Sequence, residues 1–243
     1  MNELPFDSLH EECGVDDAPG IVYYGLHALQ HRGQEACGIV SAEEGRLASV
    51  KGEGLVTEVF NGDNLSTLHG RMAIGHVRYS TAGGGGRENV QPFVFRHHTG
   101  DFALAHNGNL VNADALRSQM EDDGAIFQTT VDTEVILSLI ARESSKGLIE
   151  AVRSMMEKVR GSYALVLLAK DKLIGIRDPY GIRPLCLGRV GSSFVLASES
   201  CALDAVGAEF VRDVQPGEIV VIDAEGVHSM HVKTPMRSRL CLF

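Results

Sequence analysis

The sequence predicts an α+β fold in which largely antiparallel sheets pack against helices. Segments typical of strands lie early and late in the chain, with a helical stretch between them, and tight turns separate the later strands. Strands and helices do not alternate regularly, which disfavours a parallel sheet built from βαβ units. With 243 residues, the chain can bury one substantial core or two small ones.

Individual elements follow from the spacing of apolar residues. Apolar alternation and β-branched residues predict strands at 46–60, 72–78, 102–106, 163–169, 172–177, 193–197 and 218–223. Apolar spacings of three and four predict helices at 21–31, 112–121, 132–144 and 147–159. Asn112 and Asp132 are expected to be N-caps, because their side-chain oxygens can accept from free backbone N–H groups. The segment 169–172 is short enough to be the turn of a hairpin.

Composition and charge exclude several classes of function. A formal net charge of −10 argues against the clustered basic face that nucleic-acid binding requires. No stretch approaches the roughly 20 apolar residues needed to span a bilayer, and the acidic N-terminus does not resemble a secretory signal. We therefore expect a cytoplasmic protein with reduced cysteines and neither a nucleic-acid nor a membrane partner. Cys37, Cys186 and Cys201 lie in apolar runs and are expected to be buried and inert.

Several residues could carry chemistry, although each also has a structural interpretation. A lone cysteine such as Cys13 is more often structural than catalytic. The segment 23–35 predicts an amphipathic helix that Gly33 ends in the left-handed conformation. Arg78, at the end of a predicted strand, suits either a two-pronged grip on a carboxylate or a surface salt bridge.

The later candidates have the same ambiguity. Asn107-Gly108 is ordinarily a turn signal, but an Asn amide and a Gly N–H can also form an oxyanion hole. Asp132 is either a helix cap or a carboxylate that receives a substrate ammonium. The glycine run 83–86 suits a mobile loop.

Taken together, the motifs resemble the class II (N-terminal nucleophile) glutamine amidotransferases, and within them the phosphoribosylpyrophosphate amidotransferase branch. In chain order they are YYGLHALQHRGQE, GHVRYSTAGGGG, NVQPF, LAHNGNL, TVDTEV, RDPYGIRPL and ASES. The resemblance implies a four-layer αββα Ntn-hydrolase sandwich of two mainly antiparallel sheets flanked by helices. It further implies a propeptide at 1–12 that is removed on maturation and a glutaminase domain at 13–235. Residues 236–243 would begin the segment leading to a phosphoribosyltransferase domain, which is not in this sequence.

The resemblance also assigns roles to the catalytic candidates. Cys13, once N-terminal, would attack L-glutamine and release glutamate and ammonia through a thioester. Its free α-amino group would act as the base, since its reference pKa of about 7.7–8.0 lies close to that of a thiol, about 8.5. Asn107 and Gly108 would form the oxyanion hole. Arg78 would hold the α-carboxylate of glutamine, and Asp132 its α-ammonium.

Further roles concern a closing loop, the nucleophile and the longer protein. Thr81 would belong to a loop that closes over glutamine, while Arg32 and Gly33 would position the terminal cysteine. The ammonia would serve phosphoribosylamine formation from phosphoribosylpyrophosphate (PRPP) in de novo purine biosynthesis. Glutamine hydrolysis would need no cofactor. In the full-length enzyme, Cys241 would be one of four ligands of a [4Fe–4S] cluster, Mg²⁺ would accompany PRPP on the other domain, and the protein would form homo-oligomers.

One departure from the family pattern concerns the residues after Cys13. Compared with the family, about half a dozen residues of an apolar strand are missing after Val15, which at about 3.3 Å per residue removes roughly 20 Å of strand. Three hypotheses stay open: an active glutaminase, an inactive domain that only binds glutamine or a partner, and a glutaminase domain of the glutamate-synthase type.

Overall fold

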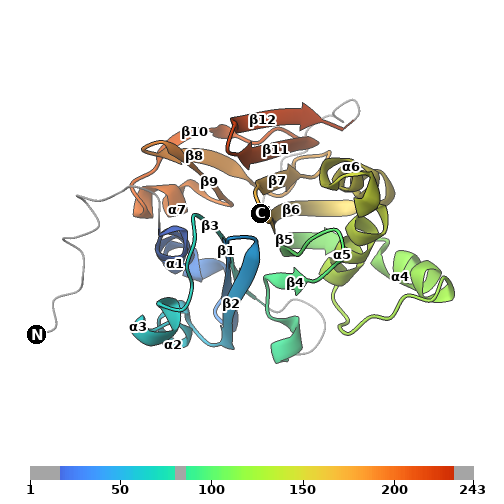
Figure 1. Ribbon diagram of the computed structural model, residues 1–243, viewed down its shortest axis with the longest axis horizontal. Coiled ribbons are helices and arrows are strands. Elements are labelled where there is room, and N and C mark those ends of the chain that lie inside the picture. Colours follow the sequence, from blue (N-terminus) through green and yellow to red (C-terminus); the bar gives the residue numbers. More distant parts are fainter. Residues whose placement is uncertain (1–16, 80–85, 233–243) are drawn as a thin grey trace, which may run out of the picture.

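The computed structural model describes residues 17–79 and 86–232, whose helices and strands are arranged in four layers (Figure 1). One inner layer is a six-stranded antiparallel sheet, and the other consists of two three-stranded antiparallel sheets. Helices α4, α5 and α6 cover the outer face of the large sheet, and α1, α2 and α7 cover the small sheets. The predicted α+β class and αββα layering are confirmed, with one inner layer divided in two.

The large sheet and its helices contain most of the central part of the chain. In spatial order its strands are β12 (Gly226–His231), β11 (Glu218–Asp223), β7 (Leu173–Arg177), β6 (Gly161–Ala169), β5 (Phe102–Leu110) and β4 (Phe93–Phe95). The covering helices are α4 (Ala113–Asp122), α5 (Asp132–Glu143) and α6 (Leu148–Lys158), with the short η3 (Ser144–Lys146) before α6.

The opposite side of the sandwich is built from shorter pieces. One small sheet has the order β2 (Arg46–Glu53), β1 (Ala36–Glu43), β3 (Met72–Arg78), and the other has the order β10 (Glu209–Asp213), β8 (Cys186–Val190), β9 (Ser193–Ala197). The helical elements of this half are α1 (Ala18–Ala28), η1 (Gln30–Arg32), α2 (Val56–Val59), α3 (Gly62–Leu65), η2 (Arg87–Asn89) and α7 (Ser200–Ala205).

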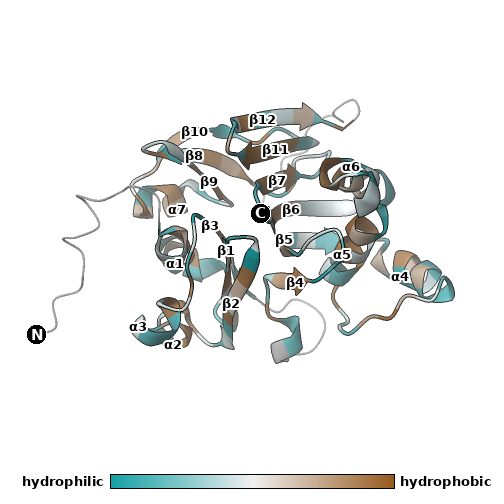
Figure 2. Ribbon diagram, in the orientation of Figure 1, coloured by the Kyte–Doolittle hydropathy of each residue, from teal (hydrophilic) through white to brown (hydrophobic). Residues whose placement is uncertain are grey.

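Apolar side chains pack on both faces of the large sheet. In Figure 2, β7 and β11 are among its strands coloured as hydrophobic. Between the sheets, Val40 and Ile74 pack with Ala103 and Leu168. On the other face, α5 and α6 bury an extensive apolar cluster against β5, β6 and β7. This two-sided burial fixes the ends of β3 and β5 close to each other.

Helix α1 is held against the start and the middle of β3. Asp17 caps the helix by accepting from the Gly20 N–H at 3.0 Å, and it forms a parallel β-bridge with Gly70. Farther along, α1 approaches β3 so closely that a Cβ on Gly75 would lie 2.5 Å from Val22. The chain preceding α1 is thus anchored beside the residue two positions before β3.

A buried carboxylate organises the connection between the two inner layers. The chain leaves β7 of the large sheet and enters β8 of a small sheet through residues 178–185. The fully buried Asp178 accepts from the backbone N–H groups of Tyr180 at 2.9 Å, Ile182 at 3.3 Å and Arg183 at 3.1 Å. These bonds replace the ladder that a regular strand or helix would supply.

Several local predictions were wrong. The strand expected at 46–60 ends at Glu53 and is followed by α2. Asp132 is the first residue of α5 rather than its N-cap, which is Val131. Asn112 occupies the N-cap position of α4, but its amide donates to the Lys158 carbonyl rather than capping the helix. Gly33 has φ −173° and is extended, so it does not end a helix in the left-handed conformation.

Candidate active site

Three segments distant in sequence meet at the ends of β3 and β5. Arg78 is the last residue of β3, Asn107 and Gly108 lie on β5, and Asp132 opens α5. His76 of β3 lies beside His106 of β5, and both line the same cavity as Asn107. The structure therefore brings Asp132 to the strand that carries Asn107 and Gly108, and Arg78 follows His76 by two residues on the neighbouring β3.

The loop before β1 packs directly against the end of β3. A Cβ on Gly33 would lie 2.5 Å from the carbonyl oxygen of Arg78, so only glycine permits this approach. The same carbonyl accepts from the Glu35 N–H at 3.2 Å. Gly33 thus holds the backbone of Arg78 in place.

Asn107 and Gly108 form no turn, because β5 continues through both and pairs with β6. Gly108 has φ +155°, a conformation that side-chain-bearing residues rarely adopt. A Cβ at this position would overlap the carbonyl oxygen of Ser162 and lie 2.8 Å from the Tyr163 Cα. The backbone of Gly108 is therefore held in a special conformation beside a polar side chain, Asn107.

Asp132 is joined to β5 by two hydrogen bonds. One carboxylate oxygen accepts from the Leu110 N–H at 2.9 Å, and the other lies 3.3 Å from Nδ1 of His106. Burial alone raises the pKa of Asp132, but the hydrogen bond with His106 and those from backbone N–H groups outweigh it, so the pKa is lowered. A carboxylate has about four acceptor positions, so the ionised Asp132, with its side chain 21% exposed, retains capacity for a further donor.

His106 is a site residue that the sequence analysis did not select. It is buried, and its Nδ1 lies 3.1 Å from the Thr133 hydroxyl while its backbone N–H donates to the Gln91 side chain at 2.7 Å. Its Nε2 has no hydrogen-bond partner among the described residues. The sequence feature that could have identified His106 as a site residue is its position directly before Asn107.

His76 is the second histidine that was missed. Burial, followed by the electrostatic effect of the neighbouring His106, lowers the pKa of His76 to about 4. Its Nδ1 is buried and makes no hydrogen bond to any described residue. His76 is therefore neutral near pH 7.

Arg32 forms an ion pair with Glu199 at the start of α7. Nε2 of His31 lies 3.0 Å from the same carboxylate, and the Cys201 thiol donates to it at 3.7 Å. Burial raises the pKa of Glu199, but the hydrogen bond from Arg32 outweighs this effect and lowers the pKa. His31, Glu199 and Cys201 have metal-like spacing, with ligand atoms within 4.8 Å of one another, but the Arg32 charge already occupies this carboxylate and would repel a cation.

The described cysteines match the expectation in two of three cases. Cys37 and Cys186 are buried, and burial raises the pKa of Cys37 to about 12 and that of Cys186 to about 11. Cys201 is only half-buried, because it lies at the start of α7, so the prediction of full burial was wrong there.

Three predicted site residues lie outside the described ranges: Cys13, Thr81 and Cys241. Most of the glycine run at 83–86 also lies outside them.

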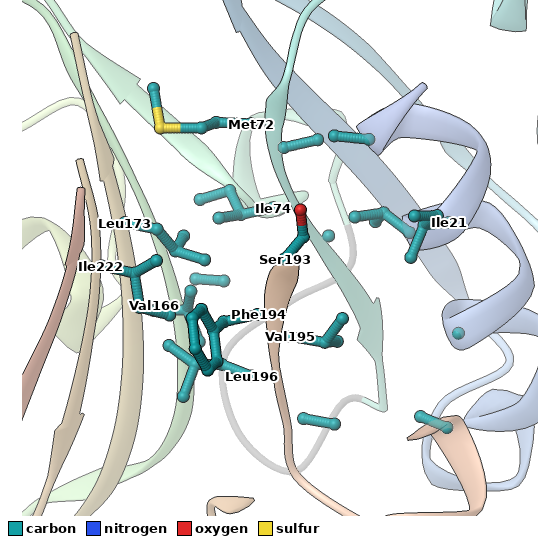
Figure 3. A pocket seen from close by; sticks show the side chains of 18 of the residues that line it. Ile21, Met72, Ile74, Val166, Leu173, Ser193, Phe194, Val195, Leu196 and Ile222 are labelled. Atoms are coloured by element: carbon teal, nitrogen blue, oxygen red, sulfur yellow. The ribbon is translucent and has the colours of Figure 1, made fainter. Parts of the chain in front are cut away.

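A cavity of about 710 Å³ adjoins the site, with His76, His106 and Asn107 among its lining residues. Its sides come from β3 and β9, and the large sheet contributes Val166, Leu173 and Ile222 (Figure 3). Most of the side chains that point into it are apolar, including Ile74 and Leu196.

None of the described helices has the length and apolarity needed to cross a membrane.

Comparisons with known proteins point consistently to one group. Residues 76–205 match the family model described as "Glutamine amidotransferase domain". The chain is 48% identical over 240 residues to amidophosphoribosyltransferase of Bacillus subtilis, covering 96% of this chain and 50% of that protein. It is 45% identical over 228 residues to amidophosphoribosyltransferase of Archaeoglobus fulgidus, covering 93% and 50%.

Solved structures agree with these relatives. The glutamine PRPP amidotransferase of Bacillus subtilis, complexed with ADP and GMP, superposes with a TM-score of 0.89 at 47% identity, covering 94% of this chain and 50% of that one. A protein described as a glutamine aminotransferase class-II domain protein, from Silicibacter pomeroyi, has a TM-score of 0.56 at 15% identity, which supports the fold alone. The chain spans about half the length of the curated relatives that it matches.

Proposed function

The chain belongs to the glutamine amidotransferase domain family, and from this premise we propose that its site hydrolyses L-glutamine to glutamate and ammonia. The observation that supports this most is the contact between β3 and β5 at His76 and His106. Arg78 ends β3, Asn107 and Gly108 lie on β5, and Asp132 pairs with His106. A cationic side chain, a carboxylate and two amide donors are the groups that a free amino acid with a side-chain amide requires.

Recognition of glutamine would divide between its two ionic groups. Arg78 would pair with the α-carboxylate through its guanidinium fork. Asp132 would accept from the α-ammonium, and its lowered pKa keeps it ionised at neutral pH. The hydrogen bond between His106 and Asp132 would hold this carboxylate in a fixed orientation. Together these groups would select free glutamine over a protein-bound amide.

Bond breaking would depend on Cys13 and the oxyanion donors. The Cys13 thiolate, after transferring its proton to its own α-amino group, would attack the amide carbon of glutamine. The Asn107 side-chain N–H and the Gly108 backbone N–H would stabilise the oxyanion, a contribution of about 2.7–4 kcal/mol per donor. The proton on the α-amino group would pass to the leaving ammonia, and water would then hydrolyse the thioester to glutamate.

The role of the longer protein is part of the same proposal. We assign the chain to amidophosphoribosyltransferase, in which the ammonia would convert PRPP to phosphoribosylamine on a phosphoribosyltransferase domain and enter purine biosynthesis. This assignment is supported by the names of its relatives. The full-length protein would be a cytoplasmic homo-oligomer, with Mg²⁺ bound alongside PRPP.

A [4Fe–4S] cluster does not fit the described cysteines. Cys37 and Cys186 are buried in two separate apolar clusters and so cannot share a cluster with four thiolate ligands. Cys241 would therefore act with ligands from the longer protein. Glutamine hydrolysis would use no metal group.

Labelling with diazo-oxo-norleucine, a glutamine-like electrophile, tests the proposed reaction. Intact mass should show one adduct on a chain that begins at Cys13, and Cys13→Ser should abolish both the adduct and ammonia release. Cys37→Ser is the matched control, because this buried thiol should not contribute to either readout. Ammonia release by Cys13→Ser, or by a chain that retains residues 1–12, would contradict the proposal.

A second candidate function is a domain that binds glutamine without hydrolysing it. Asp17 is anchored at Gly70, before the start of β3, and only four residue steps separate Asp17 from Cys13. Such a short link restricts how far the nucleophile can move toward the oxyanion donors, and this favours the alternative.

A further inference from the structure

Two strand edges border the cavity beside the candidate active site. In the described part of the chain, β3 pairs only with β1, and β9 pairs only with β8. The lining of the cavity includes every residue at 71–76 and at 192–198, rather than alternate ones, as expected where a strand presents its edge instead of one face. Such an edge carries backbone N–H and C=O groups that another extended segment can pair with.

One straight segment can lie along both edges. In Figure 3 the chain passes from Met72 to Ile74 and from Ser193 to Leu196 in the same direction. Near their C-terminal ends, β3 and β9 pack on the same apolar cluster, although the two strands do not pair with each other. A strand between them would lie about 4.8 Å from each edge and would join the two three-stranded sheets into one.

The space between the two edges has apolar surroundings on both sides. Helix α1 contributes Ile21 and Val22 from one side, and the large sheet contributes Val166, Leu173 and Ile222 from the other (Figure 3). A strand covered on both faces carries apolar residues at successive positions rather than at alternate ones. Because β3 has seven residues and β9 has five, a matching segment has five to seven such residues.

Acidic side chains lie at the end of the cavity where β3 begins. Asp171 and Asp223 follow the strands β6 and β11, in turns beside the start of β3, and they line the cavity with Glu225 and Arg71. Lys172 lies 3.5 Å from Asp171 and 3.8 Å from Asp223. The three carboxylates outnumber these two cations, so a basic residue next to the apolar run would complement this end.

We propose that the space between β3 and β9 binds an extended segment of another polypeptide, with five to seven apolar residues followed by basic ones. Every described strand already has its place in one of the three sheets, so the segment comes from a second molecule. It pairs antiparallel with both edges, the more stable arrangement, which places its basic C-terminal end beside the acidic groups. An apolar small molecule would fill the cavity but leave both edges unpaired. Peptide binding at this place does not require that the chain hydrolyse glutamine.

Isothermal titration of the full-length chain with three synthetic peptides tests the proposal. The probe is acetyl-Val-Ile-Ala-Val-Ile-Val-Lys-Lys-amide; one control is N-methylated at alternate residues, and the other carries the two lysines at its N-terminal end. The probe should bind, and each control should bind at least about tenfold more weakly, because it lacks ladder donors or places its charges away from the acidic end.

Each peptide can contradict a different part of the proposal. Absence of binding by the probe would overturn it outright. Equal binding by the N-methylated peptide would show that the cavity accepts apolar material without strand pairing. Equal binding by the peptide with N-terminal lysines would refute the antiparallel orientation.

Two substitutions of phenylalanine by lysine test whether the peptide occupies this cavity. Phe194 of β9 points into the cavity (Figure 3), whereas Phe210 of β10 is 50% exposed and is not among the residues that line it. Phe194→Lys should weaken binding of the probe at least about tenfold, and Phe210→Lys should leave it unchanged, with circular dichroism confirming that both variants fold. Equal affinities of the two variants would overturn the assignment to the cavity.

Amide hydrogen exchange of the unmodified chain gives a test that does not depend on the folding of a variant. The probe should slow exchange in β3 and β9, because their open edges become paired. The strands β2 and β10, which form the other edges of the same small sheets, should exchange at unchanged rates. Protection of β2 or β10 without protection of β3 and β9 would place the peptide on an outer edge and refute the proposal.

Discussion

Replacement of Gly108 by alanine tests whether the backbone at the proposed oxyanion hole has the close packing described. The added Cβ would overlap the Ser162 carbonyl oxygen, lie 2.8 Å from the Tyr163 Cα and lie 2.9 Å from Nε2 of His106. The first two are backbone atoms of β6, so they can move only if the ladder between β5 and β6 opens. The φ of +155° adds strain for any residue with a side chain.

The expected loss of stability has two parts. Overpacking a tight site costs about 1–3 kcal/mol, and an unfavourable backbone conformation costs about 1–3 kcal/mol. Their sum, about 2–6 kcal/mol, should lower the melting temperature by roughly 4–24 °C in a domain of this size. Gly207→Ala is the matched control, because Gly207 also has a positive φ, +65°, but nothing lies within 4 Å of its added Cβ. The stability of Gly207→Ala should fall only by the cost of the unfavourable backbone conformation.

Thermal unfolding followed by circular dichroism, together with urea titration, measures both variants. Gly108→Ala should melt about 2–12 °C below Gly207→Ala, because only Gly108 adds the overpacking cost. Equal melting temperatures for the two variants would refute the claim that β6 crowds Gly108, and with it the account of why glycine is required there.

Three further predictions concern pH, an ion pair and glutamine affinity. Because the pKa of His76 is lowered to about 4, from about 6.5 in an unfolded chain, the unfolded state binds more protons between these values. The free energy of unfolding should therefore fall by about 2–3 kcal/mol between pH 7 and pH 4, less so in His76→Gln; urea titrations with equal pH slopes for both chains would contradict this. Glu218→Gln should lower the free energy of unfolding, measured in urea, by about 1.5–3 kcal/mol, because the buried carboxylate accepts from Arg212 at 2.7 and 2.9 Å. The control Glu209→Gln changes an exposed carboxylate and should alter this free energy by less than about 0.5 kcal/mol. Similar losses in both variants would refute the distinction between the buried and the exposed carboxylate. Arg78→Ala should weaken glutamine binding by roughly 10- to 100-fold, as seen in equilibrium binding, and a fall in turnover number with unchanged affinity would rule out the carboxylate role.

Local patterns predicted three strands with the bounds that the structure has. The strands expected at 72–78, 193–197 and 218–223 coincide with β3, β9 and β11. The strand β1 was missed because seven of its eight residues are buried, so it lacks the alternation that marks a strand exposed on one face. The helix α7 was missed because it has only six residues, too few to show helical periodicity.

The site was predictable only where its residues form motifs. Arg78 at a strand end and Asn107-Gly108 were found from local sequence, and the structure joins Asp132 to the strand that carries Asn107 and Gly108. The pairing of His106 with Asp132 joins residues 26 positions apart, and that of Arg32 with Glu199 joins residues 167 positions apart. The periodicity of apolar residues predicts neither pairing, because both pairings depend on how the layers pack against each other. Chain order alone also gave no indication of the cavity between β3 and β9.

The buried Asp178 has a consequence for tolerance to mutation. Where many separate hydrogen bonds hold a connection, loss of one of them weakens it only slightly. In the connection between β7 and β8, several backbone N–H groups instead donate to the single carboxylate of Asp178. The sequence around it can therefore drift, provided that backbone amides remain at the same places, while this one position has little freedom. Loss of the Asp178 carboxylate would disorder the connection that leads from β7 to β8. It would thereby separate the two halves of the sandwich from each other, rather than disturb a single loop.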